Sequence, residues 1–279
     1  MKENKQATGA PLTLHTIVSD LDGTVLPKTF RVSDRTVEAF RLAQSLGIRT
    51  ILASGRSGAS MRPHVARIGS IDPYIACNGA QTFDASGKLL REITIDVRTA
   101  HNMLRFLKER AVYTQVYYGD DIYYEDEGVY AQEYRESSGV VSTRVPDLIA
   151  LVNSPTVKIL GVAESARIPA LIAEAQSLYS GTLSITTSEP WFFEVSAIGA
   201  TKGSALASLA DTLGFAREGT LAIGDSLNDL SMIEWAGMGV AIGNARDEIR
   251  QCAWRVADVC DADGAARLIE ELIAEGYRP

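Results

Sequence analysis

Two aspartates separated by one residue, Asp20 and Asp22, stand where an apolar run ends and Gly23 and Thr24 follow. Side chains alternate between the two faces of a strand, but once the strand ends and the chain turns, both carboxylates can converge on one pocket. Carboxylates this close repel each other unless a cation lies between them, and hard oxygen ligands of this kind suit Mg²⁺. The stretch therefore favours a Mg²⁺-dependent phosphoryl site with Asp20 as nucleophile. The alternative is an ordinary strand-end turn, because Asp and Gly are common turn formers.

Three further polar clusters lie at the boundaries of predicted elements. Ser54-Gly55-Arg56 and the stretch 225–229 each follow a predicted strand, and Lys202 opens a predicted helix. Strand ends of an open parallel sheet face one crevice, and a helix start favours anions. Together the clusters offer carboxylates for a metal, groups for phosphate oxygens and one ammonium, which is the set that phosphoryl transfer requires. Ser54 could also cap the next helix, and Arg56 is either a surface arginine or a gate near the substrate.

The segments that must hold these clusters alternate between strand and helix. Short apolar runs predict strands, and apolar residues at helical spacing predict helices. The predicted strands are 14–19, 48–53, 74–77, 220–223 and 239–242, and the predicted helices include 33–46, 202–213 and 264–275. Such alternation indicates a parallel sheet with helices on both faces. We therefore expect a doubly wound α/β core.

The pattern changes after Gly79. A predicted hairpin, followed by strands and helices that pair like an open α+β sheet, indicates an inserted second domain. We expect a flexible tail at 1–12, a core domain formed by 13–81 and 191–279, and an α/β cap domain over 82–190. The insert is dense in tyrosine, which either packs its sheet or lines a surface that faces the substrate.

Composition excludes several classes of protein. The 279 residues carry a net charge of −8 with a pI near 5.0, whereas a general nucleic-acid binder has a basic face. Cys77, Cys252 and Cys260 are few, odd in number and not in metal spacing, which indicates a reducing compartment without disulfides or zinc. No apolar run is long enough to span a bilayer, and the polar N-terminus is not a signal peptide. We expect a cytoplasmic protein that binds neither membrane nor nucleic acid, and the sequence indicates no oligomeric state.

Four ordered motifs resemble those of the haloacid dehalogenase superfamily. They are Asp20-Leu21-Asp22-Gly23-Thr24, Ser54-Gly55-Arg56, Lys202-Gly203 and Gly224-Asp225-Ser226-Leu227-Asn228-Asp229. The stretches 77–80 and 240–245, with the insertion between the second and third motifs, resemble the Cof-type phosphatases that carry a class IIB cap. The resemblance covers nearly the whole chain after the tail.

The resemblance implies a role for each matched carboxylate. Asp20 corresponds to the nucleophile that becomes an aspartyl phosphate. Asp22 corresponds to the general acid/base, which protonates the leaving alkoxide and then activates water. For Mg²⁺ the resemblance implies ligation by Asp20, by Asp225 and by the backbone carbonyl of Asp22, with Asp229 supporting the metal from the same loop.

The resemblance also implies how the phosphate is held. The hydroxyl of Ser54 and the backbone amides of Gly55 and Leu21 correspond to groups that bind phosphate oxygens. Lys202 corresponds to the cation that neutralises phosphate and nucleophile, and Asn228 to an amide that supports the phosphate. Ser54 stands where threonine is common in the superfamily, but the hydroxyl is kept.

We therefore expect a Mg²⁺-dependent phosphatase for small-metabolite phosphomonoesters, such as sugar or cofactor phosphates, under a lid that excludes water. One alternative is a signalling protein that carries a phosphoaspartate. Asp22 weighs against this alternative, because a general acid/base would promote rapid hydrolysis of the phosphoaspartate. The inserted domain also weighs against it, because such a signalling protein needs no lid. The other alternative is a phospholigand-binding module without turnover, against which the presence of both Asp20 and Asp22 weighs. No motif in the cap identifies the substrate.

Overall fold

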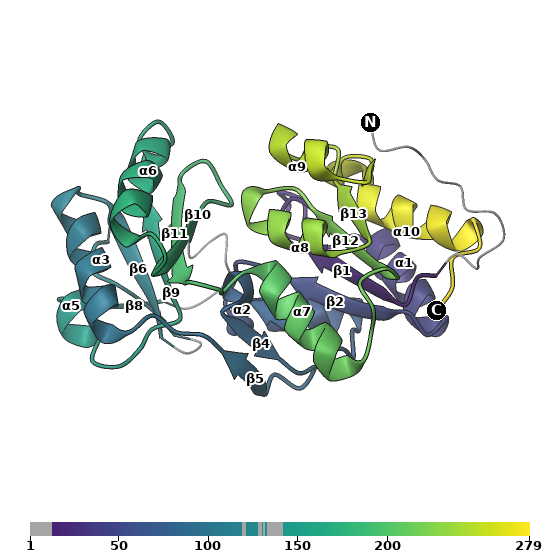
Figure 1. Cartoon of the computed structure of the whole chain (residues 1–279), viewed down its shortest axis with the longest axis horizontal. Helices are drawn as coiled ribbons and strands as arrows, with labels where there is room; N and C mark the ends of the chain where they lie inside the picture. Colours follow the sequence, from purple (N-terminus) through teal and green to yellow (C-terminus); the bar gives the residue numbers. More distant parts are fainter. Residues whose placement is uncertain (1–12, 119–120, 128–129, 131, 133–141) are drawn as a thin grey trace.

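The computed structural model describes residues 13–118, 121–127, 130, 132 and 142–279. The tail expected at 1–12 lies outside these residues. Two sheets organise the chain, and Figure 1 shows each of them with its own helices in a separate half of the molecule. None of the helices among the described residues combines the length and the apolar character that a membrane span requires.

Within the described residues the first sheet has eight strands, in the order β14-β13-β12-β1-β2-β3-β4-β5. Their bounds are β1 (Thr16–Asp20), β2 (Arg49–Ala53), β3 (Tyr74–Ala76), β4 (Gln81–Phe83), β5 (Leu89–Glu92), β12 (Thr220–Gly224), β13 (Met238–Ala241) and β14 (Arg255–Val256). Neighbours from β14 to β3 are parallel, whereas β4 and β5 add an antiparallel hairpin at one edge. The doubly wound parallel core that the sequence predicts is confirmed.

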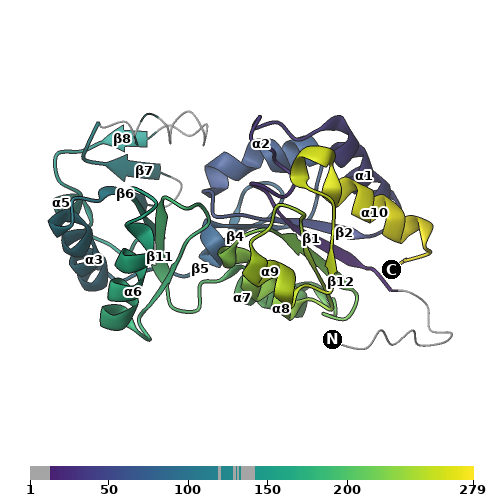
Figure 2. The same cartoon turned by 90° about the horizontal axis from the view of Figure 1, so that it is seen from above.

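Helices cover both faces of this sheet. Helices α1 (Asp34–Ser45), α2 (Gly58–Ile68) and α10 (Gly264–Ala274) lie on one face, and α7 (Lys202–Leu213), α8 (Leu230–Trp235) and α9 (Asp247–Cys252) lie on the other (Figure 2). Alternation along β1 supplies both cores, because Ile17 packs with the first group and Val18 with the second. Short 3-10 turns follow β3 and β12 at Cys77–Gly79 and Leu227–Asp229, and a third lies at Cys260–Ala262.

The second sheet has six strands in the part of the chain that is described, in the order β10-β11-β9-β6-β7-β8. Their bounds are β6 (Tyr113–Tyr118), β7 (Asp121–Tyr124), β8 (Ser142–Arg144), β9 (Lys158–Val162), β10 (Leu183–Thr186) and β11 (Phe192–Ala197). All neighbours are antiparallel except β7 and β8. Helices α3 (Val97–Glu109), α5 (Leu148–Leu151) and α6 (Ile168–Tyr179) pack on one face, and the opposite face meets Cys77, Ala80 and Ala200 of the first half.

Two segments at the expected domain boundaries lie in the other sheet. The hairpin of β4 and β5 was predicted, apart from Gln81, to belong to the cap, but it extends the first sheet because β4 pairs with β3. Strand β11, which was predicted to belong to the core, lies between β10 and β9 in the second sheet. Both assignments were wrong because an alternating strand pattern does not say which sheet the strand joins. The division into core and cap is otherwise kept here as a prediction, with these two segments exchanged.

Local signals explain where the key helices begin and end. The hydroxyl of Ser33 caps α1 by accepting a hydrogen bond from the backbone N–H of Thr36. Thr201 caps α7 in a reciprocal capping box with Ser204, and Gly214 ends that helix in the left-handed conformation. These caps fix Lys202 at the first position of α7, as the sequence predicts.

Candidate active site

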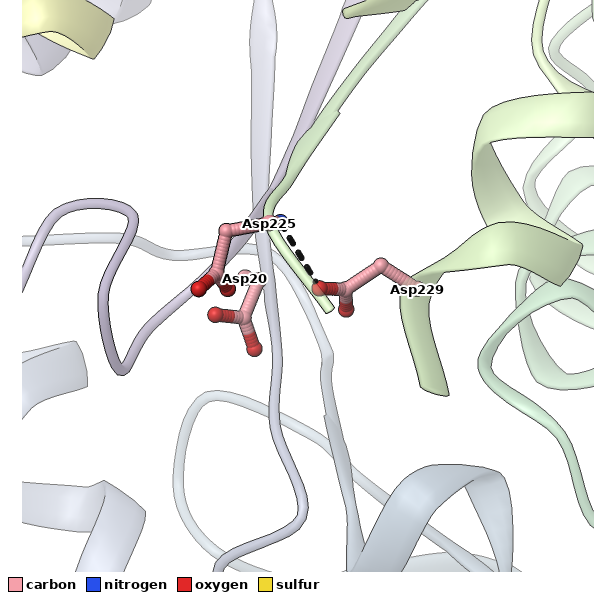
Figure 3. Close-up of side chains that lie close together, drawn as sticks. All are labelled: Asp20, Asp225 and Asp229. Carbon is pink, nitrogen blue, oxygen red and sulfur yellow. Dashed lines mark hydrogen bonds between the residues drawn. The ribbon is translucent and has the colours of Figure 1, made fainter. Parts of the chain in front are cut away.

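Parallel pairing brings two aspartates together at the carboxyl edge of the first sheet. Asp20 is the last residue of β1, and Asp225 follows the adjacent strand β12, with Ser19 in register with Ile223. Asp229 reaches the same point from the turn after β12, and Figure 3 shows the three carboxylates facing one another. One oxygen from each lies within 4.8 Å of the other two. Sequence neighbours alone do not make this cluster, because it joins residues more than 200 positions apart.

Lys202 enters the cluster from the start of α7. Its Nζ lies 2.5 Å from Asp20 Oδ1 and 2.5 Å from Asp229 Oδ1, and none of its side chain is exposed. Burial lowers the pKa of Lys202, but the two carboxylates outweigh burial and the net direction is upward. Lys202 is therefore held as an ammonium group beside the predicted nucleophile.

The carboxylates outnumber the ammonium, and their pKa values reflect this. Burial, then Asp229, raises the pKa of Asp20 well above its ordinary value, and Lys202 opposes the rise. Burial, again followed by Asp229, raises the pKa of Asp225 to about 8. A divalent cation would oppose this rise in the pKa values of Asp20 and Asp225, because it supplies positive charge at close range. The hard oxygens and the excess of negative charge fit Mg²⁺.

Asp229 differs from the other two carboxylates because both of its oxygens are engaged. Oδ1 accepts from Lys202, and Oδ2 accepts from the backbone N–H groups of Asp225 and Ser226, each at 3.0 Å. The side chain is fully buried. It braces the turn that presents Asp225 and holds Lys202 in position, so Asp20 and Asp225 are the better placed to ligate a metal.

Gly23 and Thr24, in the loop after β1, lie against the carboxylate of Asp225. Gly23 has φ +76°, and a Cβ atom there would lie 2.6 Å from Asp225 Oδ2, so this turn needs glycine both for its conformation and for the close approach. Thr24 Oγ1 lies 3.4 Å from Asp225 Oδ1. The Gly23 turn thereby lets the loop after β1 pass directly beside Asp225.

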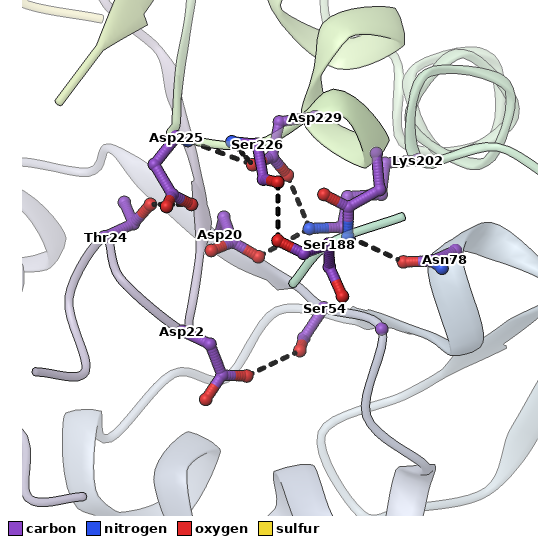
Figure 4. A network of polar contacts seen from close by, with 12 residues as sticks. Asp20, Asp22, Thr24, Ser54, Asn78, Ser188, Lys202, Asp225, Ser226 and Asp229 are labelled. Carbon is purple, nitrogen blue, oxygen red and sulfur yellow. Dashed lines mark hydrogen bonds and ion pairs between the residues drawn. The ribbon is translucent and has the colours of Figure 1, made fainter. Parts of the chain in front are cut away.

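Asp22 lies at the side of the cluster rather than within it. Its carboxylate accepts from Arg56 in a two-point contact, with Nη2 2.7 Å from Oδ1 and Nε 2.8 Å from Oδ2. Ser54 Oγ is 3.4 Å from Asp22 Oδ2, the contact drawn in Figure 4. Of the two alternatives for Arg56, the surface arginine is wrong, because its side chain is largely buried against Asp22. Asp22 is more exposed than Asp20, which suits a group that exchanges protons with a leaving group or water.

The remaining predicted phosphate-binding residues lie around Ser54. Leu21 and Ser54 are buried, and Ser54 Oγ accepts from the backbone N–H of Arg56 rather than capping α2, which Ser57 caps. Asn228 donates to the side chain of Asn78, whose backbone has φ +57°. Figure 4 shows Ser54, Asn78 and Lys202 on the side of the cluster opposite Asp225. Asn78 itself was not among the predicted site residues.

A cavity opens over these residues, and both sheets line it. Its walls include Asp20, Asp22, Ser54, Arg56 and Asp225 from the first half, and Tyr117, Lys158, Leu160, Glu189, Phe192 and Glu194 from the second. Burial, followed by the charge of Asp22, raises the pKa of Glu189. Lys158, Glu189 and Glu194 were not among the site residues predicted from the sequence. A signal for two of them existed, because Lys158 and Glu194 are charged residues within otherwise apolar strands.

Of the tyrosines in the inserted segment, some pack the sheet and one lines the cavity. Tyr117 lines the cavity. Tyr113 and Tyr124 pack together on the same sheet face, and Tyr118 and Tyr123 pack at the helix-covered face. Most described tyrosines of the sheet therefore serve packing, and Tyr117 faces the site.

Comparisons with known proteins agree with this geometry. A sequence model of the haloacid dehalogenase-like hydrolases matches residues 17–269. Phosphatase YwpJ of Bacillus subtilis is 30% identical over 92% of this chain and 99% of its own length. The 5-amino-6-(5-phospho-D-ribitylamino)uracil phosphatase YcsE of the same species is 28% identical over 92% of this chain and 95% of its own. The solved structure of a haloacid dehalogenase-like hydrolase from B. subtilis, 29% identical, superposes with a TM-score of 0.85 over 93% of this chain and all of that one.

Proposed function

Because this chain belongs to the haloacid dehalogenase-like hydrolases and is a phosphatase of that family, we propose that it hydrolyses phosphomonoesters of small metabolites, with Mg²⁺, through an aspartyl phosphate on Asp20. The observation that carries the proposal is that Asp20 and Asp225 meet at a cavity whose wall also holds Ser54, while the buried ammonium of Lys202 pairs with Asp20. A cavity roofed by the second sheet suits a small substrate.

The first half-reaction forms a covalent intermediate. Asp20 attacks phosphorus as a carboxylate, the new Oδ–P bond forms, and the bond from phosphorus to the leaving oxygen breaks. The leaving alkoxide takes its proton from Asp22, which Arg56 positions beside Ser54. In the second half-reaction Asp22 takes a proton from water as that water attacks phosphorus, and Asp20 is released with inorganic phosphate. Atoms and protons balance over the two steps.

Charge neutralisation comes from fixed groups. Lys202 donates to Asp20 and would extend the same charge to a phosphoryl oxygen. The hydroxyl of Ser54 and the amides of Leu21 and Gly55 are assigned to the other phosphoryl oxygens. Asp20, Asp225 and the Asp22 carbonyl would hold Mg²⁺, which supplies positive charge to the phosphoryl group when bound. Asp229 would orient Lys202 and the Asp225 backbone rather than bind the metal directly.

The test measures phosphate release over a panel of sugar, nucleotide and cofactor monophosphates with Mg²⁺ or with EDTA. We expect turnover that EDTA abolishes and Mg²⁺ restores, and complete loss in Asp20→Asn. Asp34→Asn is the matched control, because Asp34 is exposed at the start of α1, and it should retain activity. Appreciable turnover by Asp20→Asn would refute the assignment of Asp20 as the nucleophile. Activity that EDTA does not change would refute the requirement for a metal ion.

The alternative functions predict a different outcome of the same experiment. A phosphoaspartate-bearing signalling protein would accept phosphate from a small phosphodonor and keep it, and a binding module would retain phosphomonoesters without releasing phosphate. A phosphoenzyme lifetime much longer than the assay, measured after rapid quenching, would favour the first. Binding without any phosphate release would favour the second.

A further inference from the structure

A buried ion pair lies in the wall of the cavity that the predicted nucleophile also lines. Lys158 of β9 and Glu194 of β11 are each 2% exposed, and the Lys158 ammonium donates to Glu194 Oε1. The same ammonium donates to the backbone carbonyl of Gly55 at 2.9 Å. Gly55 belongs to the loop that carries Ser54, so the pair lies between the second sheet and a loop assigned to phosphate binding. Both side chains line the cavity.

The second carboxylate oxygen of Glu194 stands apart from this ion pair. Oε2 is buried and has no hydrogen-bond partner among the described residues. A buried carboxylate oxygen without a donor is costly, because it has lost its water and gained nothing in exchange. Since Glu194 lines the cavity, a molecule that occupies the cavity can supply the missing donor. A protonated amine, a hydroxyl group or an N–H would each do so.

Aromatic side chains also line the cavity. Phe30 and Trp191 both line the cavity and are 51% and 43% exposed. Phe30 has φ +54°, a backbone conformation that bulky residues rarely adopt. An exposed aromatic ring on an unfavourable backbone gains nothing for the fold, but it is placed to contact a flat ligand. Tyr117 and Phe192 of the second sheet line the cavity as well, and the Phe192 ring contacts that of Trp191.

The wall also carries a second carboxylate. Glu189, in the loop between β10 and β11, lines the cavity, and the adjacent Ser188 carbonyl accepts from Ser226 at 2.7 Å. That hydrogen bond ties the loop to the turn that presents Asp225. Glu189 and Glu194 together make this end of the cavity unfavourable for a further anion on the substrate.

We propose that this end of the cavity is a leaving-group subsite in which Glu194 accepts a hydrogen bond from the substrate while the aromatic side chains contact a flat, apolar part of it. The inference rests on the proposed function and deepens it. The substrate class is the monophosphate of an alcohol that carries a ring and at least one hydroxyl or amino group, without a second anionic group. Glu194 is the residue that selects for the donor.

The test uses three kinds of benzyl phosphate, six compounds in all, that differ only in a ring substituent remote from phosphorus. They carry a hydroxymethyl, a methyl or a carboxylate group, each as the 3- and the 4-isomer, and kcat/KM is measured with Mg²⁺. The wild type should prefer the hydroxymethyl ester to the methyl ester by at least about tenfold, the effect of one hydrogen bond to a charged group. The benzyl phosphate that carries the ring carboxylate should have the lowest kcat/KM.

The variant Glu194→Gln tests whether Glu194 accepts the hydrogen bond from the substrate. The amide keeps an acceptor for Lys158 but replaces one carboxylate oxygen by an amino group, so the preference for the hydroxymethyl ester should fall at least about tenfold. Glu174→Gln is the matched control, because Glu174 pairs with Arg110 on the surface of the same half and does not line the cavity. It should leave the ratio unchanged.

Two results would overturn the subsite while leaving the proposed function intact. One is an equal loss of kcat/KM for all three esters in Glu194→Gln, which is what a purely structural ion pair would give. The other is a wild type that does not favour the hydroxymethyl ester. If Glu194→Gln fails to fold, an inhibition assay on the wild type still tests the subsite. Benzene-1,3-dimethanol, which carries the additional hydroxyl group, should inhibit the hydrolysis of an aryl phosphate better than 3-methylbenzyl alcohol does, and equal inhibition would overturn the subsite. Failure of the wild type to hydrolyse any ester would overturn both proposals.

Discussion

Replacing Lys202 by methionine should destabilise the protein far more than the loss of one surface lysine would. The Lys202 ammonium lies 2.5 Å from the carboxylates of both Asp20 and Asp229, in a site from which solvent is excluded. Methionine fills a similar volume but leaves two buried carboxylates without their cation. Breaking a buried pair in this way costs about 3–5 kcal/mol of unfolding free energy, because the remaining charge is both desolvated and unpaired.

The magnitude can be converted into a melting temperature. For a chain of this size, 1 kcal/mol corresponds to roughly 2–4 °C, so the metal-free variant should melt roughly 6–20 °C below the wild type. The deficit should shrink as the pH is lowered, because protonation neutralises the unpaired carboxylates. Turnover should be lost as well.

Scanning calorimetry in EDTA, at pH 8 and at pH 5, measures the melting temperatures of the wild type and of Lys202→Met. Lys108→Met is the matched control, because Lys108 pairs with Glu125 at 3.1 Å on the surface, where such pairs contribute about 0–1 kcal/mol. The double variant Lys202→Met/Asp229→Asn should recover part of the stability, because one of the unpaired charges is then gone. Equal melting temperatures for the two lysine variants would refute the reasoning.

Two further predictions concern the same site. In EDTA the free energy of unfolding should fall as the pH rises from about 4 to about 8, by up to about 1.4 kcal/mol per pH unit, because the folded state keeps a proton on Asp225 (pKa about 8) that the unfolded chain (3.8) has lost. Mg²⁺ should restore the loss in urea titrations at pH 8, and a flat pH profile would contradict the prediction. Gly79→Ala should cost about 3 kcal/mol, because Gly79 has φ +97° and an added Cβ would lie 2.1 Å from the carbonyl oxygen of Thr201 at the start of α7. Gly181→Ala shares the positive φ but meets nothing within 4 Å, so it should cost only about 1 kcal/mol, and equal losses would mean that contact with α7 is not the cause.

Some features of the site follow from local chemistry and could be predicted without a structure. Strands that end in polar residues, such as β1 at Asp20 and β12 before Asp225, must meet at one edge once the sheet is parallel, because all carboxyl ends of parallel strands lie together. Lys202 was placed at the start of its helix because capping and helix-end signals are local. These features involve short segments, and each is decided within a few residues of itself.

Other features were decided by contacts between distant residues. The use of both Asp229 oxygens, the pairing of Asp22 with Arg56, and the transfer of β11 to the second sheet all depend on which surfaces meet after folding. Sequence pattern fixes which face of a strand is apolar, but not which strand lies next to it.

The cavity wall gives the clearest example of what the tertiary structure adds. Lys158 and Glu194 are 36 positions apart and Gly55 is a further 103 from Lys158, so no local rule relates them. The sequence by itself determined the chemistry that we propose, because the predicted catalytic and phosphate-binding groups are carried by short motifs at strand and helix ends. Only the tertiary structure decided which residues of the second sheet line the cavity beside these motifs, because that wall forms where the two halves of the molecule meet.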